Sequence, residues 1–74
     1  MSSIERSYEK ILVKVAENIK KIRKSKGISP LGMEKFGFDV RNYQRLESGS
    51  HSPSLYTLHK LAASFKVEIE DFFK

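Results

Sequence analysis

Thirteen residues, Gly37 to Gly49, constrain this chain most, because they fit one short helix with two unlike faces. Asp39 is a favourable N-cap residue, and Gly49 suits the left-handed position that ends a helix. On a helical period of about 3.6 residues, Tyr43 and Leu46 fall on one side. The opposite side carries Val40, Arg41, Gln44 and Arg45. The rest of the chain must cover the apolar side, while the polar side offers groups that suit base edges and phosphates.

Length and composition narrow the class of protein. Seventy-four residues suffice for one domain with a small core, so residues 1–74 are expected to form a single domain. The formal net charge of +5 favours a polyanionic partner such as nucleic acid. The absence of cysteine excludes disulfides and thiolate chemistry. No apolar run approaches the roughly 20 residues that cross a bilayer, and no secretory signal is evident. We therefore expect a cytoplasmic protein without membrane contact.

The segment from Ser3 to Lys26 has the pattern of a long amphipathic helix. Ser2 and Glu5 fit a capping box at its start, and Gly27 fits the glycine that follows a helix end. Apolar residues recur along it at spacings of three and four, at Ile4, Tyr8, Ile11, Leu12, Val15, Ile19 and Ile22. A membrane-surface role for this basic helix is disfavoured, because so small a chain needs the stripe for its core.

The remaining sequence predicts shorter helical elements. They are a short helix, the two-faced helix, a longer helix and a final turn, over residues 30–36, 40–48, 55–65 and 69–73. Ser29 and Pro30 are a favourable N-cap and first residue for the short helix, and Ser54 is a favourable N-cap for the longer one. Because no strand-like alternation occurs, the chain is predicted to be an all-α bundle of about five helices.

Two helices joined by a short glycine-containing turn, the second with a polar outer face, are typical of a helix-turn-helix. In this context the chain resembles the Cro/repressor-type helix-turn-helix proteins, the XRE family, from about Val13 to Phe73. The matching residues are Ile19, Ile22-Arg23, Lys26-Gly27-Ile28-Ser29, Gly37, Tyr43-Gln44-Arg45-Leu46-Glu47-Ser48-Gly49, Pro53-Ser54-Leu55, Leu58 and Leu61-Ala62. The resemblance implies a five-helix, lambda-repressor-like bundle with a central helix-turn-helix. Residues 1–12 would be an N-terminal extension of its first helix.

The extension and the second helix depart from the family pattern. The extension and the residues just beyond it carry the apolar side chains of Ile4, Tyr8, Ile11 and Val15. The favoured interpretation is that they add to the core, and the alternative is that they form part of a subunit contact. Gly32-Met33 stand where Leu-Ala is usual, and Pro30 replaces a polar residue that contacts a phosphate in relatives. The packing of the second helix is therefore open, whereas the recognition face keeps the family pattern.

The resemblance implies that the helix over residues 40–48 is a recognition helix in the major groove. The bases would be read by Val40, Arg41, Gln44 and Arg45. Phosphates would be contacted by Ser29, Asn42, Ser48, Ser50, His51 and Ser52. Surface solvation is the alternative for each of these polar side chains. The family pattern also pairs Glu47 with Arg23 as a partly buried, structural salt bridge.

We therefore expect a regulator of transcription that binds double-stranded DNA sequence-specifically, as a homodimer on a two-fold symmetric operator. It would be cytoplasmic and associated with the nucleoid, with repression or activation left open. The predicted dimer surface is Tyr56, Ile69, Phe72 and Phe73. The alternative is an antitoxin-like or other protein-interaction module for which DNA binding is secondary. An enzyme is disfavoured, because His51 and His59 lie in no motif with catalytic spacing. Two histidines also supply too few ligands for a metal, and no cofactor is expected.

Overall fold

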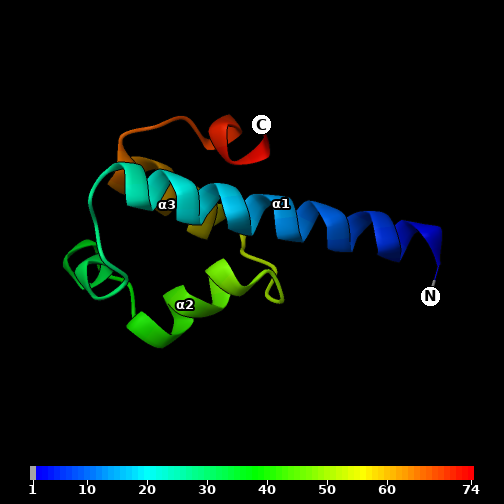
Figure 1. Ribbon diagram of the computed structural model, residues 1–74, viewed down its shortest axis with the longest axis horizontal. Coiled ribbons are helices and arrows are strands. Elements are labelled where there is room, and N and C mark those ends of the chain that lie inside the picture. The colour runs from blue at the N-terminus through cyan, green and yellow to red at the C-terminus, as the bar shows by residue number, and fades with distance from the viewer. Residues whose placement is uncertain (1) are drawn as a thin grey trace.

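The computed structural model describes residues 2–74, and helical segments account for nearly all of its regular structure (Figure 1). Three α-helices and two 3-10 helices follow one another as α1 (Ser3–Ser25), η1 (Leu31–Phe36), α2 (Val40–Ser48), α3 (Leu55–Phe65) and η2 (Ile69–Phe73). No strand occurs within residues 2–74. The all-helical prediction is confirmed. The predicted count of five helices is not confirmed, because two of the five segments are short 3-10 helices.

The long helix α1 begins and ends where its local signals predict. The Glu5 N–H donates to the Ser2 hydroxyl at 3.2 Å, and the Ser2 N–H donates to the Glu5 carboxylate at 3.3 Å, which completes the capping box. At the other end, Gly27 adopts a φ of +69°, which a side chain would strain. These two caps set the length of the helix on which the other elements pack.

The second helix is a 3-10 helix, and Gly32 has a structural reason to be there. The Ser29 hydroxyl accepts a hydrogen bond from the Gly32 N–H at 3.0 Å. Ser29 therefore caps η1, although it lies two residues before the first helical residue, Leu31. A Cβ on Gly32 would lie 3.1 Å from Cγ2 of Ile28 and 3.3 Å from the Ser29 hydroxyl. A larger residue would therefore press on its own cap. Met33, the other unusual residue, is fully buried in the core.

The core lies where α1, α2, α3 and η2 meet. Its largest fully buried side chains are Tyr43, Phe65, Phe72, Ile19, Met33 and Leu61. Two edge-to-face aromatic pairs help to define it: Phe38 with Tyr43, at 5.9 Å between ring centroids, and Phe65 with Phe72, at 6.4 Å. The predicted packing side of α2 is therefore built into the centre of the molecule.

The N-terminal part of α1 stands free of this core. Figure 1 shows it as the blue end of the ribbon, which extends well beyond the other elements. Ile4, Tyr8 and Ile11 are 80%, 46% and 50% exposed, whereas Val15 is buried. The interpretation of the stripe as extra core is thus wrong for the first three residues and right for Val15. The physical reason is that only the loop after α2 reaches this part of α1, where Ser52 bonds to the Tyr8 hydroxyl, and it leaves the three side chains largely exposed.

The C-terminal turn also corrects one prediction. Phe72, which we placed in a dimer surface, has no exposed surface and packs against Phe65. The backbone carbonyl of Phe72 accepts a hydrogen bond from Asn18 at 2.9 Å, which holds η2 against α1. Phe72 is therefore a core residue. Among the other predicted interface residues, Phe73 is 48% and Tyr56 70% exposed, and Ile69 is half-buried against the core.

Candidate nucleic-acid interface

Helix α2 spans Val40–Ser48 and is capped at both ends by the residues that the sequence indicated. The Asp39 carboxylate accepts a hydrogen bond from the Asn42 N–H at 3.1 Å. Gly49 ends the helix with a φ of +79°, a conformation that favours glycine. Together with η1 and the turn through Gly37, α2 forms a helix-turn-helix unit.

The outer face of α2 carries three polar side chains that nothing in the described residues engages. Arg41, Gln44 and Arg45 are exposed, while Val40 between them and the body is half-buried. Within residues 2–74, none of the three polar side chains takes part in a hydrogen bond or an ion pair. Their donor and acceptor groups can therefore bind an external partner without breaking an internal contact.

The predicted partners Arg23 and Glu47 form a buried, two-pronged ion pair. Nε of Arg23 lies 2.6 Å from one carboxylate oxygen of Glu47, and Nη2 lies 3.0 Å from the other. The remaining guanidinium nitrogen donates to the backbone carbonyl of Ile28 at 2.7 Å. The two side chains are 6% and 11% exposed. One guanidinium thus fixes α1, the start of the helix-turn-helix and α2 relative to one another.

Electrostatics at this pair favour the charged form of Arg23. The hydrogen bond to the Glu47 carboxylate raises the pKa of Arg23 above its ordinary value. Beside them, burial raises the pKa of the Tyr43 phenol, so this hydroxyl stays protonated. The Tyr43 hydroxyl has no hydrogen-bond partner within the described residues. Tyr43 therefore contributes its ring to packing, whereas Arg23 and Glu47 contribute the polar connection.

Lys60 makes a second connection to the helix-turn-helix, which sequence reasoning missed. Its ammonium group donates to the Gly37 carbonyl at 2.8 Å and lies 4.5 Å from the centroid of the Phe38 ring. Gly37 has a φ of +85°, and a Cβ there would lie 3.1 Å from the ammonium nitrogen. Lys60 therefore holds the turn against α3. A lysine on an exposed helix flank carries no local signal of such a contact.

Two of the predicted phosphate-contacting residues have free donor groups. Ser29 accepts a hydrogen bond from the Gly32 N–H, so its own hydroxyl proton remains available. The exposed Asn42 side chain makes no hydrogen bond within residues 2–74. Ser29 precedes η1 and Asn42 lies in the first turn of α2, so the two residues belong to the two helices of the unit.

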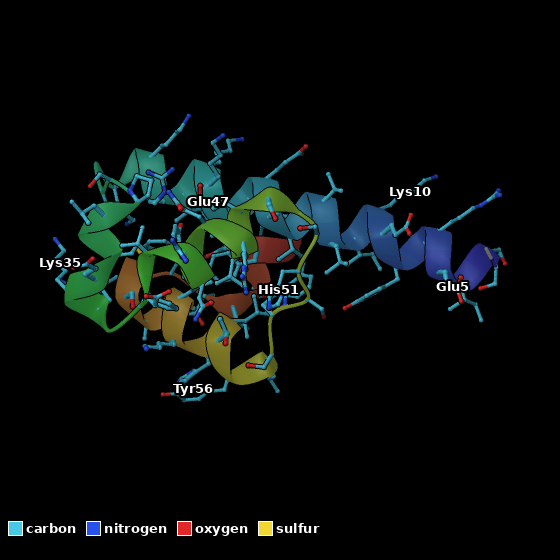
Figure 2. The ribbon with its side chains drawn as sticks, turned by 90° about the horizontal axis from the view of Figure 1, so that it is seen from below. Glu5, Lys10, Lys35, Glu47, His51 and Tyr56 are labelled. Atoms are coloured by element: carbon cyan, nitrogen blue, oxygen red, sulfur yellow. The ribbon has the colours of Figure 1, made fainter. Side chains whose placement is uncertain are left out.

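The serines after α2 are more constrained than the sequence suggested. The Ser48 hydroxyl donates to the Arg45 carbonyl at 2.6 Å and lies 2.8 Å from the Ser50 hydroxyl. Because the Ser48 proton is already committed, Ser50 donates in this second bond, and neither proton is free. Ser52 is bonded to the Tyr8 hydroxyl of α1. His51 is exposed and lies on the loop between α2 and α3, as Figure 2 shows.

Comparison with known proteins agrees with this geometry. Residues 19–72 match a family model described as Helix-turn-helix, a stretch that begins in the last third of α1 and includes η1, α2, α3 and most of η2. No curated protein and no solved structure matches the chain significantly. In the part of the chain that the structure describes, no helix has the length and apolar character that crossing a membrane requires.

Proposed function

The chain belongs to the Cro/C1-type (XRE) helix-turn-helix family, and we propose that it reads a specific operator as a homodimer. The family binds double-stranded DNA and regulates transcription. The observation that carries the proposal is the outer face of α2, where Arg41, Gln44 and Arg45 are exposed and unpaired opposite a fully buried Tyr43. A regulator of this kind acts where the DNA lies, in the cytoplasm and at the nucleoid.

Each side chain of this face has a matching base edge. Arg41 and Arg45 can each form two parallel hydrogen bonds with O6 and N7 of guanine, and Gln44 can do the same with N6 and N7 of adenine. Val40 can contact the methyl group of thymine. Ser29, Asn42 and His51 supply phosphate contacts at the two ends of the unit. At Ser48, Ser50 and Ser52, phosphate contacts require their internal hydrogen bonds to rearrange.

We infer a dimer because one recognition helix contacts only a few base pairs. About three or four side chains of a recognition helix reach base edges. Two copies on a two-fold symmetric site double that number and place the recognition helices about 34–36 Å apart, one turn of the duplex. Selecting bound sequences from a random duplex pool tests this directly. Two inverted half-sites at that spacing are expected, and a single asymmetric site would contradict the homodimer.

A second candidate function has one observation in its favour. The exposed apolar residues Ile4, Tyr8 and Ile11 at the free end of α1 suit a protein partner, as in an antitoxin-like module with secondary DNA binding. The same selection experiment separates the two functions. If the main partner is a protein, the selection is expected to enrich duplexes with only a weak shared sequence or none.

Removing either arginine of the outer face is expected to weaken specific reading of the DNA. Arg41→Ala and Arg45→Ala should each weaken binding to the selected duplex by about 1–3 kcal/mol and relax the preference at one base pair. Binding is measured by fluorescence anisotropy. Arg6→Ala, which removes the same charge from the far end of α1, serves as the control and should retain the sequence preference. Equal losses in all three variants would mean that charge alone drives binding.

Asp39 allows its capping role to be separated from its charge. Asparagine caps a helix as well as aspartate does, so Asp39→Asn should leave the melting temperature nearly unchanged, whereas Asp39→Ala should cost about 1 kcal/mol of stability. Removing a carboxylate beside the DNA should also raise the affinity of Asp39→Asn for any duplex about two- to fivefold at low salt. A lower affinity of Asp39→Asn would place this end of α2 away from the phosphates.

A further inference from the structure

The free end of α1 carries an apolar stripe with the spacing of a two-helix seam. Ile4, Tyr8, Ile11 and Val15 follow one another at intervals of four, three and four residues, which is the a/d spacing of a coiled coil. Val15 is buried by its own chain, but Ile4 is 80%, Tyr8 46% and Ile11 50% exposed. The stripe therefore continues from the core onto a part of α1 that residues 2–74 leave largely exposed, although the Tyr8 hydroxyl is bonded to Ser52.

An apolar groove lies at the base of the same helix. It has a volume of about 180 Å³, and its lining includes Ile11, Val15, Pro53, Leu58 and Phe73. For comparison, an apolar cavity of about 150 Å³ is large enough to bind benzene. The groove can therefore accept a branched aliphatic side chain, and Phe73, which is 48% exposed, forms part of its wall.

The free stripe and the groove complement each other in one antiparallel arrangement of two copies. When Tyr8 of one copy lies opposite Ile11 of the other, the two-fold axis also places Ile11 of the first copy opposite Tyr8 of the second. The same alignment puts Ile4 of each copy opposite Val15 of the other, at the groove. The most exposed apolar residue of the stripe then meets the apolar hollow at the base of the helix.

Charges along the helix favour the same alignment. Glu5 and Glu9 lie toward the free end, and Lys10 and Lys14 lie toward the body. In Figure 2, Glu5 and Lys10 mark these two levels of the projecting segment. With Arg6 counted at the free end, the antiparallel alignment still sets the net negative end of each helix beside the net positive part of the other. Glu5 and Lys14 lie on opposite flanks of the seam, so this is an attraction between whole segments and involves no direct ion pair. A parallel alignment would instead bring like charges level, within a Debye length of about 10 Å.

We propose that residues 3–12 of α1, the α1 extension, pair antiparallel with the α1 extension of a second copy, each Ile4 entering the groove of the other. This inference rests on the homodimer of the proposed function and assigns its surface. Of the dimer surface predicted from the sequence, it keeps Phe73 and replaces Tyr56, Ile69 and Phe72 with the stripe. Two short helices bury less than the roughly 1,200–2,000 Å² of a standard interface. The free protein should therefore dimerise only weakly, and two half-sites on one duplex should complete the pair.

Cysteine cross-linking tests the alignment, because the natural chain contains no cysteine. Glu5 and Leu12 lie on the same flank of the seam, and the alignment brings Glu5 of one copy near Leu12 of the other. A mixture of Glu5→Cys and Leu12→Cys proteins, oxidised on a selected two-half-site duplex, is expected to form a disulfide between the two variants. Arg6→Cys mixed with Val13→Cys, on the outer side of the helices, is the matched control and should not cross-link. Equal yields in the two mixtures, or none in either, would overturn the proposal.

Ile4→Glu provides a second measurement. It places a charge at the groove but lies far from α2, so binding to a duplex with one half-site should stay within about twofold of the natural protein. Binding to a two-half-site duplex should weaken about tenfold through lost cooperativity, equivalent to 1.4 kcal/mol. Unchanged cooperativity would contradict the pairing and leave the DNA-reading function intact. If the natural protein prefers no sequence on either duplex, it is the proposed function that fails.

Discussion

Glu47→Ala is expected to destabilise the domain by about 3–5 kcal/mol, because it leaves the Arg23 guanidinium buried without its counter-charge. Arg23 is 6% exposed, and two of its three nitrogens bond to Glu47. For a domain of this size each kcal/mol lowers the melting temperature by about 4–8 °C. Thermal unfolding should therefore shift by more than about 10 °C. An unchanged melting temperature would show that the pair does not hold α1 and α2 together.

Two further variants serve as controls for Glu47→Ala. Lys74→Ala removes a partner from the exposed ion pair with Asp71, whose atoms lie 2.8 Å apart, and should leave the melting temperature nearly unchanged. The double variant Arg23→Met with Glu47→Leu replaces both buried charges with apolar groups and should recover much of the loss. Failure of the double variant to recover would point to the Arg23 bond with the Ile28 carbonyl as the larger contribution.

Phe72→Ala is expected to cost about 3–5 kcal/mol, since it empties a fully buried aromatic position. Phe73→Ala, one residue on, removes a ring that is 48% exposed and should cost only about 1 kcal/mol. Urea unfolding of the two variants measures the difference. Similar losses for the two would mean that the final turn packs differently, with Phe73 sharing the core. A small loss for Phe72→Ala alone would return Phe72 to the surface.

Local signals predicted helix α2 well because they are strong and agree with one another. Asp39 and Gly49 mark its ends, and the spacing of Tyr43 and Leu46 marks its buried side. Capping and periodicity act within a few residues, so they can be read without knowing the rest of the fold. The partnership of Arg23 and Glu47 is a long-range contact, and only the family resemblance predicted it.

Features that depend on where other elements end could not be predicted in this way. Ile4 and Ile19 share one helical stripe, yet one is 80% exposed and the other fully buried, because the remaining elements cover only part of α1. Phe72 and Phe73 are chemically identical neighbours, and the angle at which η2 meets α1 decides which is buried. The contact of Lys60 with the Gly37 carbonyl likewise depends on how α3 lies beside the turn.

Comparing a selected duplex with a shuffled duplex of the same composition, over a range of salt concentrations, tests the central claim most directly. The claim is that the outer face of α2 reads base edges. Affinity for both duplexes should fall steeply with salt, since phosphate contacts release counterions. The selected duplex should stay bound at least about 10³-fold more tightly at physiological salt. Equal affinities for the two duplexes at every salt concentration would contradict the claim.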